Sequence, residues 1–438
     1  MQAAADCYAS LADFRLQRIR CRDYTFGRQW NDRVEIDGKI MSEYDYIVSE
    51  GSVPLKNNLI SRIVRNVLGV FRKQLDDLVD IDNDLLRQNF EKNRLAELYS
   101  RTMEEFLISG LAVHRKWIGL RDGEPGVWTE SVSPESFFFN GSARDARGWD
   151  VDMIGEIHKV DFRTWCSEFV SNEKEFQEAR RQFDVFTKGM KVYEIWRREM
   201  RPRRLVHLKH SGKLLKIEEN ETFISSNGCE CRSKWFLDDV WRYYYISENG
   251  VVLKEGDSPY LHGSHPFVFR GYPFLDGEIK SFVYDIIDQQ RYANRLITLY
   301  DWVIRSSAKG VLLMPETAVD TENLQEVADQ WSRFNGVIVY RPKTGVPDPR
   351  QVCGNTSNIG ISELLEIQLK MLEDVSGVNG ALQGNLAANS VSGTLYTQQT
   401  ENSMTSLSDI LHTFGSFMQD CKEKDLSLMK QTTVNRRG

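Results

Sequence analysis

Acidic side chains near residue 80 are the first residues of this sequence whose types and spacing could do chemistry, as ligands of a calcium ion. Four carboxylates match positions one, three, five and twelve of a calcium-binding loop: Asp80, Asp82, Asp84 and Glu91. Leu85 stands where the sharp turn of such a loop needs glycine, and Arg87 stands where an apolar residue is usual. Capping of a helix by Asp82, Asn83 or Asp84 is the other interpretation of these residues.

Histidine and cysteine side chains form a second candidate site, for zinc. The set consists of His207, His210, Cys229 and Cys231. Both spacings are tighter than those of the common zinc finger, and the same residue types are also ordinary components of strands and turns. The sequence therefore leaves a zinc site and a purely structural role as alternatives.

Motifs of the commonest enzymes are missing from the sequence. It has no phosphate-binding Gly-Lys-Ser/Thr loop, no Gly-x-Ser-x-Gly elbow and no paired-histidine metal helix, and its seven histidines are dispersed. We therefore expect no catalytic residue, no cofactor and no bound metal. A metal-dependent nucleic-acid enzyme acting through the Asp80 cluster is the weaker alternative.

Length and charge limit the class of protein. The 438 residues, 41% of them hydrophobic, can bury a substantial core divided into two or three regions. A net charge of −7 argues against broad binding of nucleic acid, which needs an excess of lysine and arginine. Seven scattered cysteines predict free thiols and a reducing compartment. No stretch resembles a signal peptide or a membrane span, so we expect synthesis in the cytoplasm and no membrane partner.

The first two thirds of the chain change from a helical to a strand-like period. Apolar residues recur at helical spacing over 57–75 and 83–109. From about Leu111 the period becomes two, and an Asp122-Gly123 turn predicts a hairpin. Further strand-like runs follow, with a helical insertion over 163–186; the runs cover 191–197, 205–209, 240–246 and 251–253.

The last third is dominated by long helices. A helix over 278–307 would be about 45 Å long. A small β-α-β insert follows, with strands expected at 310–314 and 336–340 and a helix at 322–334. An uncharged loop of small and polar residues then separates a helix over 361–375 from a last helix over 394–430.

The predicted helix over 361–375 has two contrasting faces. Its apolar face is expected to pack, and it comprises Ile361, Leu364, Leu365, Leu372 and Val375. Its charged face is expected to meet water, and it comprises Glu363, Glu366, Lys370, Glu373 and Asp374. A solvated helix surface is the simpler interpretation of this charged face.

This order of elements resembles the core of the portal proteins of tailed bacteriophages. The most specific similarities are Asp288-Gln289-Gln290 through Asn294, Glu373-Asp374-Val375-Ser376-Gly377-Val378, Gly384 and Val391-Ser392-Gly393. Upstream, Phe26-Gly27-Arg28-Gln29-Trp30, Asn57-Asn58-Leu59-Ile60 and Val192-Tyr193-Glu194-Ile195-Trp196 are similar to segments of the portal wing. The resemblance covers nearly the whole chain.

The resemblance implies an α+β, portal-like fold with named parts. These are a mixed α/β wing (1–277), an outer stem helix (278–308), a small α/β clip (309–357), an inner stem helix (358–377), a tunnel loop (378–393) and a long wing helix with a short tail (394–438). Many portals continue into a helical crown after the wing helix. Here the crown is expected to be short or absent, because only about a turn of chain follows that helix.

The implied function is a DNA channel at one vertex of the viral capsid, used for packaging and ejection. A ring of about twelve copies, the usual number for the family, would carry about −84 charges, and an acidic lining lets a duplex slide. The residues expected to line the channel on the inner stem helix are Glu363, Glu366, Lys370 and Glu373. Those expected to touch the DNA backbone from the tunnel loop are Asn379, Gln383, Gly384, Asn385, Asn389, Ser390 and Ser392.

The resemblance also implies protein partners: terminase, the major capsid protein and tail adaptor proteins. The docking surface expected on the clip comprises Glu322, Gln325, Arg333, Arg341 and Lys343. Arginines around Pro202 are either a solvated hairpin tip or a contact with capsid protein or packaged DNA; they are Arg197, Arg198, Arg201, Arg203 and Arg204. A ring-forming head–tail adaptor, or another structural virion protein without a channel lining, is the main alternative.

Overall fold

Two compact units make up the chain. The computed structural model describes residues 1–78, 84–121, 123–183, 189–208, 214–218, 231–309, 311–313, 327, 329, 345, 350–352, 360–380, 382 and 393–435. The first unit comprises Met1–Phe26, Ile60–Ile287 and Ser376–Gly438, and the second comprises Gly27–Leu59 and Asp288–Val375. The fold is mixed α/β, as the sequence predicts for its coarse class.

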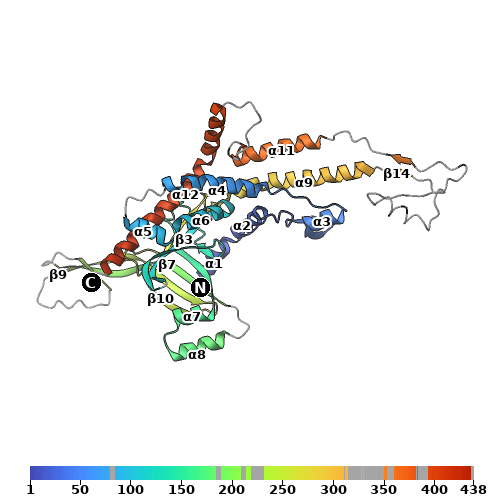
Figure 1. Cartoon of the computed structure of the whole chain (residues 1–438). Helices are drawn as coiled ribbons and strands as arrows, with labels where there is room; N and C mark the ends of the chain where they lie inside the picture. The colour runs from blue at the N-terminus through green and yellow to red at the C-terminus, as the bar shows by residue number, and fades with distance from the viewer. Residues whose placement is uncertain are drawn as a thin grey trace. The chain divides into compact units, whose positions relative to one another are not determined.

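Amphipathic helices surround the sheets of the first unit (Figure 1). They are α1 (Gln2–Ser10), α2 (Ala12–Thr25), α4 (Leu59–Leu78), α5 (Asp84–Lys92), α6 (Leu95–Ser109), α7 (Phe162–Phe169), α8 (Glu173–Gln182) and α12 (Gly393–Asn435). The helix predicted over 57–75 is α4, whose apolar stripe of Ile60, Ile63 and Val67 is buried.

Two segments whose periodicity predicts a single helical stretch are each divided into two helices. The stretch over 83–109 breaks between α5 and α6, where Arg94 adopts a left-handed conformation with φ of 49°. The insertion over 163–186 breaks at an extended Val170, and Asn172 then caps α8 by accepting a hydrogen bond of 3.0 Å from the backbone of Glu175.

Antiparallel sheets form the body of the first unit. Its strands are β3 (Leu111–Arg121), β4 (Glu124–Ser131), β5 (Phe137–Phe139), β6 (Met153–Val160), β7 (Met190–Leu208), β8 (Leu214–Glu218), β9 (Cys231–Ser247), β10 (Val252–Asp257), β11 (Phe267–Gly271), β12 (Pro273–Leu275) and β13 (Glu278–Ile279). A six-stranded sheet has the order β10-β9-β7-β6-β5, with β8 paired to β7, and a three-stranded sheet has the order β11-β3-β4. The predicted hairpin after Leu111 is the β3–β4 pair.

The arginine-rich segment around Pro202 lies inside a long strand, β7, and is not a turn. The expected hairpin tip around Pro202 is wrong, because β7 runs without interruption from Met190 to Leu208 and Pro202 pairs with Leu237 of β9. Proline has no N–H to donate, so a central strand rarely accepts it. Among the described residues, β7 is paired at Pro202 with β9 alone, since the described pairing with β6 ends at Arg197 and that with β8 begins at Arg203.

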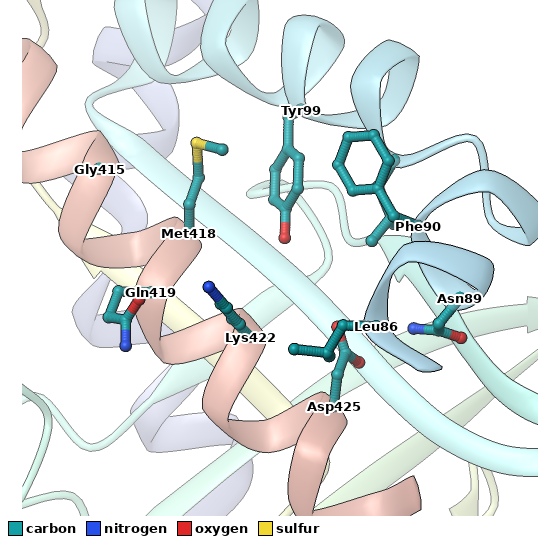
Figure 2. A pocket seen from close by; sticks show the side chains of 10 residues that line it. Leu86, Asn89, Phe90, Tyr99, Gly415, Met418, Gln419, Lys422 and Asp425 are labelled. Atoms are coloured by element: carbon teal, nitrogen blue, oxygen red, sulfur yellow. The ribbon is translucent and has the colours of Figure 1, made fainter. Parts of the chain in front are cut away.

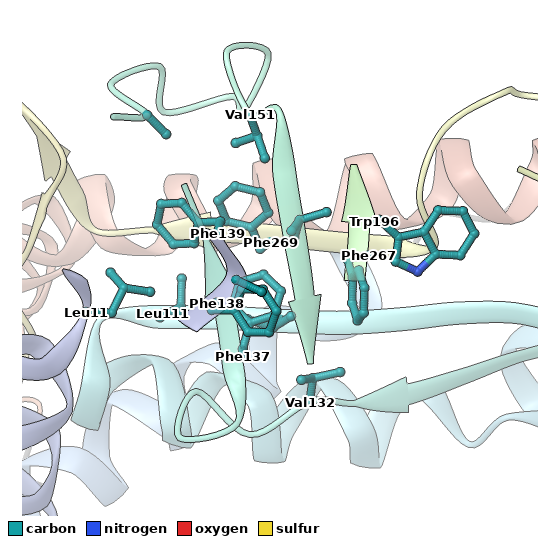
Figure 3. Close-up of a cluster of buried hydrophobic side chains, with 14 of the residues drawn as sticks. Leu11, Leu111, Val132, Phe137, Phe138, Phe139, Val151, Trp196, Phe267 and Phe269 are labelled. Atoms are coloured by element: carbon teal, nitrogen blue, oxygen red, sulfur yellow. The ribbon is translucent and has the colours of Figure 1, made fainter. Parts of the chain in front are cut away.

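The main core of the first unit lies where side chains of the six-stranded and three-stranded sheets meet (Figure 3). Phe137 and Phe139 of β5 contact Phe267 and Phe269 of β11, with ring centroids 5.7 Å apart for Phe137–Phe267 and 5.1 Å apart for Phe139–Phe269. Large aromatic side chains bury much apolar area each, so this cluster holds the two sheets together. Helix α12 packs on the three-stranded sheet.

The second unit is built on two helices. It contains β1 (Arg33–Ile36), β2 (Lys39–Ser42) and α3 (Glu43–Ser49), most of α9 (Phe282–Lys309) and α11 (Ile361–Ser376), and the paired strands β14 (Val311–Leu313) and β15 (Arg350–Val352). Helix α9 corresponds to the helix predicted over 278–307 and α11 to that predicted over 361–375. In the predicted insert, β14 matches the first strand, whereas the helix at 322–334 and the strand at 336–340 lie mostly or wholly outside the described residues.

Candidate functional site

A buried polar network joins α9 to the segment before α4, within the second unit. The side chains of Gln290 and Asn294 in α9 are 0% and 1% exposed. Asn294 Nδ2 donates to Gln29 Oε1 at 2.6 Å, and Gln290 Nε2 donates to the Asn57 carbonyl oxygen at 2.7 Å. Gln29 Nε2 in turn donates to Asn58 Oδ1 at 2.9 Å. Buried amides that satisfy one another fix the position of a helix with high specificity.

This network connects three stretches that stand apart in the sequence and that each resemble portal segments. Gln29 belongs to the Phe26–Trp30 stretch, Asn57 and Asn58 begin the next segment, and Gln290 and Asn294 lie on the first long helix. The structure brings all five residues together. Their spacing along the sequence gave no sign that they contact one another.

Helix α9 is also fixed by a buried carboxylate. Glu43, at the start of α3, is 2% exposed, and its Oε1 accepts a hydrogen bond of 2.6 Å from Arg295 Nε. Its Oε2 accepts a second bond of 3.1 Å from Arg291 Nε. Two guanidinium groups one helical turn apart therefore hold one carboxylate, which ties α3 to the middle of α9.

The charged residues predicted on α11 face water, with one exception. Glu363, Glu366 and Lys370 are exposed, whereas Glu373 is half-buried. On the opposite face Gln368, which is 5% exposed, donates from Nε2 to the Gln289 carbonyl oxygen of α9 at 3.3 Å. The charged face is therefore directed away from this contact with α9.

The predicted apolar face of α11 needs a correction. Ile361 and Leu372 are buried, with 5% and 3% of their surfaces exposed, but Leu364 is 44% exposed and Val375 is 49% exposed. The two-face description failed because Leu364 and Val375 lie to one side of the buried row and not within it.

The start of the predicted tunnel loop is held by tight packing in the first unit. Gly377 has φ of +66°, and a Cβ placed there would lie 2.7 Å from Ser406 Cβ of α12, so only glycine fits. Val378 is fully buried, and Asn379 Oδ1 accepts a hydrogen bond of 3.2 Å from the Leu382 backbone N–H. The remaining predicted loop residues lie outside the described residues: Gln383, Gly384, Asn385, Asn389, Ser390 and Ser392.

Other predicted sites also fall partly or wholly outside the described residues. These include the whole clip surface, namely Glu322, Gln325, Arg333, Arg341 and Lys343, and the metal candidates Asp80, Asp82, His210 and Cys229. Of the zinc candidates, His207 pairs with Arg232 in the β7–β9 ladder. Within the described ranges, no group of three or more histidine, cysteine, aspartate or glutamate side chains could hold a metal ion.

Arginines on β7 pair with carboxylates of neighbouring strands. Arg203 contacts Asp238 at 3.0 Å and Glu218 at 2.9 Å, and Arg198 contacts Asp239 at 2.7 Å. These ion pairs cross between β7 and its neighbours β8 and β9, so the positive charge of these arginines is largely compensated within the sheet.

Buried charges attach α12 to the three-stranded sheet. Lys116 of β3 is fully buried, and its Nζ lies 2.7 Å from Asp425 Oδ2 of α12. Burial raises the pKa of Asp425, while Lys116 opposes that effect. Figure 2 shows Asp425, Met418 and Lys422 of α12 lining a pocket together with Tyr99 of α6, and burial raises the pKa of Tyr99 well above its usual value.

A second buried carboxylate lies inside the six-stranded sheet. Glu194 of β7 is fully buried, accepts from Trp196 Nε1 at 2.8 Å, and lies 3.0 Å from Arg115 and 2.8 Å from His158. Burial acts to raise the pKa of Glu194, but Arg115 and His158 lower it to about 2. Burial likewise acts to lower the pKa of His158, and the hydrogen bond to Glu194 raises it overall.

Sequence reasoning missed both buried charge clusters as positioning elements. A signal was present for Glu194, because strand alternation places it on the same face as Val192 and Trp196. A charged residue in an inward register needs a partner. No comparable signal exists for Asp425, which is distant from Lys116 in sequence.

Within each unit, buried polar or charged contacts fix the position of a long helix, as expected of a protein whose role is structural. The chain belongs to the phage P22-like portal protein family, because the sequence model of that family matches residues 1–437. It is a phage portal subunit, and the general role of the family is to form a channel at the capsid vertex for DNA packaging and for docking of other virion components.

Three further findings accompany the family assignment. The family is structural and not enzymatic. In a comparison with individual curated proteins, none matches the chain. Among the described helices, none is both long enough and apolar enough to cross a membrane.

Proposed function

We propose that α9 and α11 are the outer and inner stem helices of the portal ring, and that the charged face of α11 lines the DNA channel. The observation that carries this proposal is the exposure of Glu363, Glu366 and Lys370 on the side of α11 away from its contact with α9. Glu373 is half-buried and contributes at the edge of this face. The wing then comprises residues 1–277 and the wing helix 394–438.

An acidic lining suits a conduit because the channel must not hold its cargo. Phosphate groups of the duplex are repelled by Glu363 and Glu366, and repulsion from all sides keeps the duplex near the axis. Lys370 adds a ring of isolated positive charge, whose attraction for phosphate is weak because the neighbouring carboxylates offset it. A ring of about twelve subunits is the assembly that we propose.

The remaining parts of the proposed stem region have separate roles. The clip, residues 309–357, is the proposed docking surface for terminase and tail adaptor proteins, and the major capsid protein is the proposed partner at the vertex. The tunnel loop, residues 378–393, carries amides and hydroxyls but no charge, so it is suited to weak hydrogen bonds with the DNA backbone. Its fixed start at Gly377 and Val378 supports an anchored loop.

Charge reversal tests the channel lining. In phage that carry Glu363→Arg and Glu366→Arg together, we expect rings of normal mass but a yield of DNA-filled heads lowered on the order of tenfold, because added phosphate contacts slow the duplex. The matched control is Glu173→Arg with Glu178→Arg on α8, where Glu173 also occupies the first turn of its helix. Equal packaging by both double variants would refute the proposed lining.

Deletion of residues 379–389 tests the loop. If the loop handles DNA, phage with this deletion should assemble rings but package DNA more slowly or lose it from filled heads. Packaged DNA is measured by nuclease protection, and retention by its release over time. Unchanged packaging and retention would show that the loop has no role in handling DNA.

A further inference from the structure

Helix α11 has three faces, and the third is apolar and exposed. The first is the buried row of Ile361, Gln368 and Leu372, and the second is the charged face already described. The third is a stripe of four residues, which we call the lateral stripe: Leu364, Ile367, Met371 and Val375, exposed by 44%, 52%, 48% and 49%. At about 100° per residue, its centre lies roughly a fifth of a turn from the buried row and roughly a third of a turn from the charged face.

The spacing of the lateral stripe is typical of a helix that packs on a partner. Its residues follow one another at intervals of three, four and four, so they form a continuous ridge about 16 Å long. A ridge of four large apolar side chains in water is unfavourable, and such patches mark interaction surfaces. If the charged face points into the channel, the ridge points towards a neighbouring subunit of the ring.

A groove in the same unit offers an apolar wall on which such a ridge can pack. It is an open hollow of about 590 Å³ bounded by β1, α3 and α9. Its apolar wall consists of Val34, Ile36, Ile47, Leu299 and Trp302. Leu299 and Trp302 are 45% and 50% exposed, so the wall is open to a partner.

The partner that fits is a second copy of this chain. A closed ring of identical subunits requires two different surfaces on each subunit, one for each neighbour. The second unit carries such a pair, since the lateral stripe is a ridge on α11 and the groove is a hollow beside α9. We propose that the lateral stripe of one subunit packs into the groove of the adjacent subunit, all around the ring.

The inference rests on the proposed stem assignment for the direction of the stripe, and on the ring assembly of the family for the identity of the partner. It adds what neither supplies, namely the two surfaces that meet. The groove also carries two carboxylates, those of Glu35 and Glu50. Because like charges repel, the carboxylates of α11 must lie outside the groove when the lateral stripe packs into it.

Cysteine cross-linking tests the contact in assembled rings. We expect Ile367→Cys or Met371→Cys, combined with Ile47→Cys, to give a ladder of covalent multimers after treatment with a short bifunctional maleimide. The matched control is Glu366→Cys with Ile47→Cys, which moves the thiol to the charged face. Each single-cysteine variant shows how much cross-linking involves the native thiols, since Cys7 and Cys166 are free and partly exposed. An equal ladder from the Glu366 pair, or none from intact rings of the stripe pairs, would overturn the contact.

A polar substitution supplies an independent test. Ile367→Asp should raise the subunit concentration at which half the chains are in rings on the order of tenfold, as measured by mass photometry, while circular dichroism shows an unchanged fold. Gln177→Asp, which adds the same charge on the exposed surface of α8, should change that concentration much less. If Ile367→Asp assembles like the native chain, the interface is wrong but the channel lining is not. If Ile367→Asp impairs assembly but Glu363→Arg with Glu366→Arg leaves DNA packaging unchanged, the proposed channel lining is wrong and the proposed interface stands.

Discussion

Buried ionised side chains are the residue-scale feature on which the first unit depends. An isolated charge inside a protein costs several kcal/mol, so each one must be paired. Glu194 meets this condition through Arg115, His158 and the indole of Trp196. It lies on β7 between β6 and β9, so the network ties the central strands of the six-stranded sheet to β3 of the other sheet.

Glu194→Gln should destabilise the first unit by about 3 kcal/mol at neutral pH, because the substitution leaves the Arg115 guanidinium largely buried without its carboxylate. Urea unfolding followed by tryptophan fluorescence measures the change. Glu173→Gln, on the exposed surface of α8, should change stability by less than about 0.5 kcal/mol. A loss of the same small size at Glu194 would mean that the network contributes little.

The Glu194 network also predicts that the stability of the first unit depends on pH. The pKa of Glu194 falls from 4.5 to about 2 on folding, so its contribution is complete above about pH 4.5 and is lost as the pH falls towards 2. The stability difference between the native chain and Glu194→Gln should therefore shrink by about 3 kcal/mol between neutral pH and pH 2. A difference that stays constant over this range would show that Glu194 is not ionised by its partners.

The Lys116–Asp425 pair makes a parallel prediction for the attachment of α12. Lys116→Met should cost about 3–5 kcal/mol, because Asp425 is then buried without a partner. Replacing both residues, as Lys116→Met with Asp425→Leu, should recover most of this loss, since no charge remains buried. Thermal unfolding of the two single variants and the double variant gives the coupling energy, and simple additivity would contradict a direct pair.

At the scale of elements, Gly377 packs closely against α12 within the first unit. An alanine there would need a left-handed backbone and would place its Cβ 2.7 Å from Ser406 Cβ, so we expect Gly377→Ala to cost about 1–3 kcal/mol. Gly415→Ala on α12 is the matched control, because nothing lies within 4 Å of its added Cβ. A mid-helix glycine to alanine change should stabilise by about 0.5–1 kcal/mol. Equal effects at the two positions would contradict the tight packing at Gly377.

Long periodic elements were the part of the fold that the sequence predicted well. Helices α9, α11 and α12 begin and end within a few residues of the predicted bounds, because each repeats an apolar stripe over many turns. Strand β7 was divided wrongly at Pro202, since proline and a cluster of arginines are local signs of a turn. The pairing of Pro202 with Leu237 of β9 is a tertiary feature, which local signs of a turn do not reveal.

The candidate site shows the same limit. Helical periodicity placed Glu363, Glu366 and Lys370 on an exposed face correctly, because that property is local. Periodicity alone could not divide the apolar residues of α11 into a buried row and the lateral stripe, since both are apolar and adjacent. Likewise, the partners of Gln290 and Asn294 come from residues 29 and 57, far away in the sequence.

At the scale of the whole molecule, acidity and ring assembly oppose each other. Each subunit carries a net charge of −7, and a ring places many copies of that charge side by side. On the proposed interface, the apolar contact between the lateral stripe and the groove must exceed this repulsion. The balance then depends on how strongly the solvent screens the charges.

Salt should therefore favour the ring. Raising the ionic strength from about 0.05 M to about 0.5 M shortens the screening length and weakens repulsion between exposed carboxylates, while the apolar contact is preserved. We expect the fraction of chains in rings, measured by mass photometry at a fixed low concentration, to rise over this range. Ile367→Asp should show a lower fraction at every salt concentration, because it adds a charge to the contact itself. Rings that dissociate as salt rises would instead mean that ion pairs between subunits hold the assembly, and that apolar packing of α11 is secondary.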